Sequence, residues 1–161
     1  MAVQAGGREL SEPLWYLTKD GDLTCLALYE RHYSARRYAD GRRRTQFIGP
    51  GQVVALRTGD GDAVFVWRKF IDDSGQDGVN CAVFRNESNH RSSTLIRQAD
   101  AIADYCWPGE RHYTYVGPKA VRSSNPGFCF MASGWRRCGA TKSGLIVLEY
   151  RVSVSNQETT L

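Results

Sequence analysis

The chain has 161 residues, a formal net charge of +4 at pH 7 and 42% hydrophobic residues. This length and composition favour one globular domain with its own core, and they exclude an intrinsically disordered chain. No run of about 18 apolar residues occurs, so no membrane-spanning helix is expected. The N-terminus lacks the basic and apolar pattern of a signal peptide, and we expect a cytoplasmic protein.

Arginine dominates the basic residues. Of the 21 lysines and arginines, 17 are arginines, and the planar guanidinium group binds phosphate through two hydrogen bonds. This bias indicates a polyanionic partner. Five cysteines are scattered along the chain without a C-x-x-C pair or zinc-finger spacing, so we expect them to be small buried hydrophobic residues.

Alternating or β-branched apolar runs predict the strands of a sheet. The runs occupy residues 14–17, 52–57, 63–70, 79–85, 112–116 and 145–150. The second and third runs flank Gly59-Asp60-Gly61-Asp62, a sequence typical of a β-hairpin turn. A further turn is expected at Gly139.

Two longer helices are expected. Asp22 fits the N-cap of a helix running to about Tyr33. A second helix at residues 94–106 connects the strands at 79–85 and 112–116, and a strand–helix–strand unit of this kind places the two strands parallel. The apolar face of the first helix is expected to be Leu23, Leu26 and Ala27.

A short third helix is expected near the C-terminus. Asn125 is a good N-cap, proline is tolerated at the first helical position as Pro126, and Gly134 fits the C-terminal end. The sequence therefore predicts an α+β fold in which a central mixed, partly parallel sheet is flanked by helices. The expected single domain covers residues 12–154, with flexible tails at 1–11 and 155–161.

An arginine-rich segment follows the first helix. Six arginines lie within the fourteen residues 31–44, with tyrosines between them. Guanidinium groups contact the phosphate backbone and aromatic rings stack on bases, so the segment predicts DNA binding. A solvated basic loop is the alternative. The candidate DNA-binding residues are Arg31, Arg36, Arg37, Tyr38, Arg42, Arg43 and Arg44.

Four side chains are candidates for catalysis. His32 can accept a proton near neutral pH, and its neighbour Tyr33 can donate a hydrogen bond. Glu87, just after a strand, is a candidate general base, and Tyr115 lies on the strand beside the expected cleft. Each of the four could instead have a structural role. Histidine spacing gives no support to a metal site, and it leaves a metal requirement open.

A candidate anion site lies at the start of the second long helix. Arg91, Ser92 and Ser93 stand where backbone N–H groups and the helix dipole favour a negative group. Ser92 or Ser93 could also be an ordinary N-cap. Asn125 completes the set of candidate cofactor-binding residues.

Five segments carry a resemblance to a known family, at residues 30–34, 84–88, 92–96, 113–116 and 125–130. They resemble phage and prophage DNA-modification proteins of the Mom type, a divergent group with the GNAT acetyltransferase fold. The resemblance implies a transferase that places a carbamoylmethyl group on the exocyclic N6 amine of adenine in DNA, which protects the DNA from restriction. It also matches Tyr115 to the GNAT hydroxyl that protonates the leaving thiolate.

The resemblance leaves the donor open. Where GNAT enzymes have glycines that approach the pyrophosphate of coenzyme A, this chain reads Arg91-Ser92-Ser93-Thr94-Leu95. The donor is acetyl-CoA or another small molecule. The alternatives are a GNAT N-acetyltransferase that uses acetyl-CoA on a small-molecule or protein amine, and a non-catalytic DNA-binding module. We expect DNA as the partner, no membrane association, and a homodimer as an open option.

The reaction requires a cleft. We expect the sheet to be splayed open between the strand that ends at Arg85 and the strand that starts at His112. The arginine-rich segment should lie beside the opening.

Overall fold

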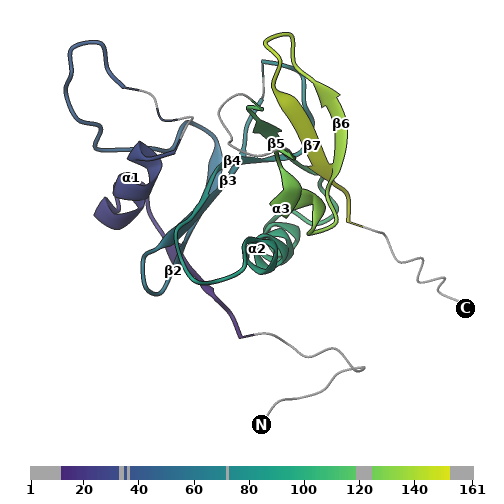
Figure 1. Ribbon diagram of the computed structural model, residues 1–161, viewed down its shortest axis with the longest axis horizontal. Coiled ribbons are helices and arrows are strands. Elements are labelled where there is room, and N and C mark those ends of the chain that lie inside the picture. The colour runs from purple at the N-terminus through teal and green to yellow at the C-terminus, as the bar shows by residue number, and fades with distance from the viewer. Residues whose placement is uncertain (1–11, 33–34, 36, 72, 119–124, 153–161) are drawn as a thin grey trace, which may run out of the picture.

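The computed structural model describes residues 12–32, 35, 37–71, 73–118 and 125–152. In these residues seven strands form one mixed sheet, accompanied by three helices (Figure 1). The α+β class and the mixed sheet expected from the sequence are confirmed. The predicted tails at 1–11 and 155–161, together with Tyr33 and Arg36, lie outside the described residues. The strands are β1 (Trp15–Thr18), β2 (Gln52–Thr58), β3 (Ala63–Lys69), β4 (Val79–Asn86), β5 (His112–Val116), β6 (Arg136–Ala140) and β7 (Ile146–Tyr150), and the helices are α1 (Leu23–Glu30), α2 (Ser92–Cys106) and α3 (Phe128–Met131).

The strand order in the sheet is β1-β2-β3-β4-β5-β7-β6. Strands β1 to β4 are antiparallel neighbours in chain order, and β2 and β3 form the hairpin that the turn sequence predicts. Helix α2 then crosses over and brings β5 parallel to β4, as the strand–helix–strand unit predicts. Strand β7 pairs antiparallel with both β5 and β6.

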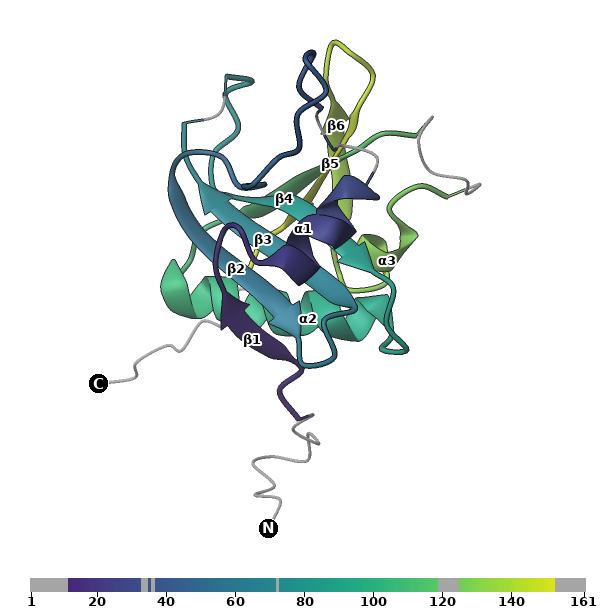
Figure 2. The same cartoon turned by 90° about the vertical axis from the view of Figure 1, so that its left-hand side faces the viewer.

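Helices cover both faces of the sheet. Helix α1 lies on one face, and α2 with α3 lies on the other (Figures 1 and 2). Because side chains alternate along a strand, β3 contributes to two cores. Phe65 and Trp67 pack under α2, and Val64 and Val66 pack under α1.

Two tryptophans attach α2 to different parts of the sheet. The indole N–H of Trp67, on β3, donates to the backbone carbonyl of Ala99 at 2.9 Å. The indole N–H of Trp135, just before β6, donates to the carboxylate of Asp100 at 2.9 Å. The other oxygen of Asp100 lies 2.7 Å from Nδ1 of the fully buried His112. Burial raises the pKa of Asp100, and the contacts with His112 and Trp135 oppose that rise.

Helix α1 is shorter than expected and buries a different face. It ends at Glu30, before Tyr33, although Asp22 is its N-cap as predicted. Leu23 is 81% exposed, whereas Cys25, Leu26 and the residues that follow on the inner face are buried. Six of the eight residues in the sequence Leu-Thr-Cys-Leu-Ala-Leu-Tyr-Glu are apolar, so the local pattern does not select a face and packing on the sheet decides.

Helix α3 starts later than expected. Its N-cap is Gly127, with a left-handed φ of 81°, so the predicted capping role of Asn125 and the first-turn position of Pro126 are wrong. The backbone carbonyl of Asn125 accepts a hydrogen bond from the N–H of Phe128 at 3.2 Å. A Cβ atom at Gly127 would come within 2.6 Å of Leu148 Cδ1 on β7, so glycine permits both the backbone angle and the close packing.

Strand β6 replaces the turn expected at Gly139. It pairs with β7, and its register shifts between Arg137 and Gly139. Every β6 residue is exposed, so the strand carries no apolar alternation from which it could be recognised.

The cysteines fall into two groups. Cys25 and Cys81 are buried as expected, and Cys129 is half-buried. Cys106 and Cys138 are exposed, which corrects the expectation of burial for these two. None of the described helices combines the length and the apolar character needed to cross a membrane.

Candidate functional site

The parallel strands β4 and β5 separate soon after they meet. Only Val79 with His112 and Asn80 with Tyr113 are paired, although β4 is eight residues long. Beyond these pairs the hydroxyl of Thr114 donates to the carbonyl of Cys81 at 2.9 Å. The gap at this place in the sheet is the geometry expected from the sequence.

A β-bulge explains why β4 turns away from β5. Val66 on β3 faces Val83, and the next residue Trp67 faces Cys81, so Ala82 is an extra residue on β4. A bulge bends its strand and increases the local twist. The extra residue Ala82 comes two residues after Asn80, the last residue of β4 that pairs with β5.

A cleft of about 840 Å³ occupies the gap, within the range of about 300–1,000 Å³ common for small-molecule sites. Its walls come from both faces of the sheet. His32 and Arg44 line it on the side of α1, and Gly127 and Cys129 line it on the side of α3. Two reactants could therefore meet in this cleft from opposite faces of the sheet.

The charged side chains that line the cleft are all positive. Its described lining contains Arg44 and Arg68 and no aspartate, glutamate or lysine. Burial, followed by repulsion from the guanidinium of Arg85, lowers the pKa of His32 to about 4. His32 is therefore neutral at pH 7, and a hydrogen bond with the backbone of Phe84 acts in the opposite direction on its pKa.

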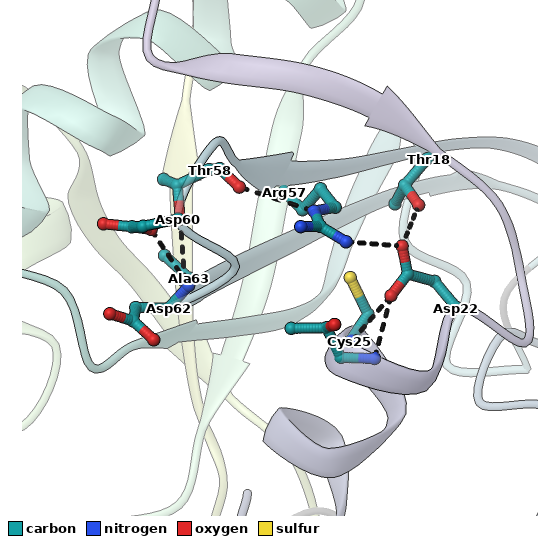
Figure 3. A network of polar contacts seen from close by, with 9 residues as sticks. Thr18, Asp22, Cys25, Arg57, Thr58, Asp60, Asp62 and Ala63 are labelled. Atoms are coloured by element: carbon teal, nitrogen blue, oxygen red, sulfur yellow. Dashed lines mark hydrogen bonds and ion pairs between the residues drawn. The ribbon is translucent and has the colours of Figure 1, made fainter.

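Helix α1, which comes just before His32 in the chain, is anchored through Asp22 (Figure 3). One oxygen of Asp22 accepts from the backbone N–H groups of Thr24 and Cys25 at 2.9 and 3.1 Å. The other accepts from the hydroxyl of Thr18 at 2.6 Å and from Arg57 at 3.1 Å. Asp22 thereby joins the start of α1 to β1 and β2.

Glu87 lies outside the cleft lining, at the end of β4. It accepts two hydrogen bonds from Arg31, at 2.9 and 3.1 Å, and one from Arg85. These arginines lower the pKa of Glu87 to about 2. A carboxylate with so low a pKa is a poor proton acceptor at neutral pH. The geometry favours a positioning role for Glu87, because it ties the end of β4 to the end of α1.

The candidate cofactor-binding residues lie apart from the cleft. Arg91 is the N-cap of α2 without a side-chain cap, so neither Ser92 nor Ser93 is the N-cap. The amide of Asn86 donates to the hydroxyl of Ser92 at 3.0 Å, and Ser93 is buried. None of these residues lines the cleft, and neither does the exposed Asn125.

Tyr115 does line the cleft and is half-buried. Its hydroxyl is 2.5 Å from the hydroxyl of Ser74, which lies in the loop between β3 and β4. Tyr115 and His32 are therefore the two candidate catalytic residues that the structure brings into one cavity.

The arginine-rich segment surrounds a second cavity of about 360 Å³. The guanidinium carbons of Arg42 and Arg44 lie 4.1 and 4.7 Å from the ring centroid of Tyr38, a distance typical of cation–π contacts. Tyr38 therefore orders two guanidinium groups. Arg44 lines both cavities and so connects the basic segment to the cleft. The second cavity is lined by Glu30 and by four candidate DNA-binding arginines, Arg37, Arg42, Arg43 and Arg44. Arg31 instead forms an ion pair with Glu87.

Three residues in the cleft were not among the sequence candidates: Arg68, Asn80 and Cys129. Arg68 crosses Gly49 so closely that a Cβ atom there would lie 1.7 Å from its Nη1. Asn80 is the one polar residue in the apolar run at the start of β4, whereas Arg68 stands beside Lys69 at the end of β3 and has no distinguishing signal in the sequence. Burial raises the pKa of the Cys129 thiol, so this cysteine is a neutral part of the wall.

No protein-family model, curated protein or solved structure matches the chain. Among the described residues no group of three or more histidine, cysteine, aspartate or glutamate side chains is arranged to hold a metal ion. The functional conclusion therefore depends on the cleft and the basic segment beside it, together with the motifs in the sequence.

Proposed function

We propose that the protein is a transferase with a GNAT-like fold that modifies the exocyclic N6 amine of adenine in DNA, as the resemblance to the Mom type implies. The observation that carries this proposal is the cleft between β4 and β5, which Arg44 connects to the arginine-lined cavity. An enzyme that acts on a base needs a pocket for the base beside a clamp for the phosphate backbone. The cleft and the adjoining arginine-lined cavity are our candidates for these two parts.

The charge of the cleft favours a DNA base over the alternative substrate, the amine of a small molecule or protein. Such amines are protonated at neutral pH, and a site that attracts them needs carboxylates. The described lining offers two arginines and no carboxylate, which repel an ammonium group and attract phosphate. The exocyclic amine of adenine is uncharged and is not repelled.

The proposed reaction is a substitution at an electrophilic carbon of a small donor. The N6 nitrogen forms a bond to this carbon, and the bond from the carbon to its leaving group breaks. The N6 proton becomes strongly acidic once the new bond to carbon forms, so a weak base is sufficient to remove it. His32, with a pKa of about 4 and unprotonated at pH 7, takes this proton, and the hydroxyl of Tyr115 donates a proton to the leaving group. The base enters on the α1 side, because the arginine-lined cavity adjoins that side through Arg44.

Mass spectrometry of nucleosides tests this proposal. DNA from cells that express the protein should contain a heavier deoxyadenosine, and cells with the His32→Ala variant should lack it. Unmodified deoxyadenosine in cells that contain folded wild-type protein would overturn the proposal.

DNA binding provides a second readout. Changing both Arg42 and Arg43 to alanine should weaken binding and reduce the slope of log K against log salt by about 1–2, since each lost phosphate contact changes the slope by about 0.9. Arg97→Ala is the matched control, because Arg97 is exposed on α2 on the opposite face of the sheet. An equal loss of binding in the control would remove the basic segment from the interface.

A further inference from the structure

Asn80 occupies the closed end of the cleft. It belongs to the last residue pair between β4 and β5, with Tyr113 as its partner, and it faces Arg68 on β3. Directly paired residues place their side chains on the same face of a sheet. Asn80 therefore points to the α1 side, beside Arg68, and both residues line the cleft.

The amide of Asn80 is deeply placed without a partner in the described part of the chain. The residue is only 5% exposed, and none of the hydrogen bonds among the described residues involves its side chain. Asn80 is nevertheless not among the residues whose unpartnered side-chain atoms are completely inaccessible to solvent. It lines the cleft, so a ligand in the cleft can contact its amide. A buried amide that lacks a protein partner gains most from a ligand that supplies the missing hydrogen bonds.

The amide has a defined recognition chemistry. Its oxygen accepts and its nitrogen donates, which matches an amino group beside a ring nitrogen, the pattern that asparagine reads on adenine. We propose that Asn80 is the specificity-determining residue of the cleft and binds this edge of the target base. Oδ1 accepts a hydrogen bond from the exocyclic amine, and Nδ2 donates to the adjacent ring nitrogen. This inference rests on the proposed function, because it assigns the residue that recognises the substrate.

Arg68, the residue on β3 that faces Asn80, supports the same role. Its guanidinium lies 3.8 Å from the ring centroid of Phe70 and lines the same cleft. A positive charge in the cleft disfavours protonation of the base, so the base is held in its neutral form. The amine keeps one N–H on Asn80, and its second proton leaves during the transfer. Asn80 thus orients the amine without taking part in the proton transfer.

A double-mutant cycle between protein and DNA tests the inference. The probes are single-stranded thymidine oligonucleotides that contain one adenine, one 7-deazaadenine or one 1-deazaadenine. Wild-type protein should bind one of the two analogues about 3- to 10-fold more weakly than adenine, because one ring acceptor is missing. Asn80→Ala should bind the adenine probe about 5- to 100-fold more weakly than wild type, with an unchanged salt slope and no discrimination between the three probes.

Two further variants complete the design. Asn80→Asp has nearly the same shape but cannot donate to a ring nitrogen, so it should also lose the discrimination, even if the alanine variant does not fold. Asn89→Ala, at an exposed asparagine in the loop before α2, should behave as wild type. Equal binding of all three probes by wild type, or retained discrimination in both Asn80 variants, would overturn the inference.

The nucleoside measurement separates this inference from the proposed function. If wild type and Asn80→Ala modify deoxyadenosine equally, the role of Asn80 is refuted and the function stands. If wild type leaves deoxyadenosine unmodified, the function is refuted, and the binding cycle still decides whether Asn80 recognises adenine.

Discussion

Replacing Asp22 measures how firmly α1 is held in the position that carries His32. Asp22→Ala removes the N-cap of α1, which costs about 0.5–2 kcal/mol, and the ion pair with Arg57, which contributes up to about 1 kcal/mol. The hydrogen bond from Thr18 is lost as well. We expect a total loss of about 2–3 kcal/mol, or about 4–12 °C in Tm for a chain of this length.

The pH dependence separates the charge of Asp22 from its capping oxygen. Burial alone would raise the pKa of Asp22, but hydrogen bonds from Thr18, the Cys25 N–H and Arg57 outweigh it and lower the pKa from 3.8 to about 2. The stabilisation is therefore fully present well above pH 3.8 and is lost as the pH falls through about 2. Its upper limit is about 2.4 kcal/mol at pH 7, and about half of it remains at pH 3.

Urea unfolding of wild type, Asp22→Asn and Asp22→Ala at pH 7 and pH 3 is the assay. Asp22→Asn keeps an oxygen that can cap the helix and loses only the charge. The stability gap between wild type and Asp22→Asn should therefore shrink by about half at pH 3, while the gap between the two variants should change little. A difference in unfolding free energy between wild type and Asp22→Asn that is the same at pH 7 and pH 3 would refute the reasoning.

Two further variants test the cleft and the core. Gly49→Ala should displace the guanidinium of Arg68, because the new Cβ would lie 1.7 Å from Nη1. We expect DNA binding to weaken about tenfold, which corresponds to the loss of one hydrogen bond to a charged group. Unchanged binding in a fluorescence titration would contradict this prediction. Asp100→Ala should destabilise the protein by about 3–5 kcal/mol, because His112 and Trp135 each lose a buried partner; urea unfolding within about 1 kcal/mol of wild type would contradict that.

Local sequence signals predicted those elements that depend on local chemistry. The carboxylate of Asp22 caps α1 through N–H groups two and three residues away, and the turn at residues 59–62 closes a hairpin by its own backbone preferences. The strand–helix–strand unit follows from two periodic segments and the length of the connection. These features need no information about distant parts of the chain.

The remaining features depend on distant partners. Ala82 is an extra residue only relative to β3, so the bulge that opens the cleft has no signal within β4 itself. Glu87 has the sequence context of a catalytic base, yet its carboxylate accepts hydrogen bonds from Arg31, which lies 56 residues earlier in the chain. Asn80 is a polar residue in an apolar run, but its functional position depends on the pairing of β4 with β5, which ends at this residue.

Only two residue pairs, between β4 and β5, join the two parts of the sheet, one of β1 to β4 and the other of β5, β7 and β6. Helix α2 accepts a hydrogen bond from a tryptophan of each part through consecutive residues, Ala99 from Trp67 and Asp100 from Trp135. The helix thus connects the two parts across the gap between β4 and β5. These hydrogen bonds hold the two parts together on the face of the sheet opposite α1, so substitutions beneath α2 can change the width of the cleft without altering a residue that lines it.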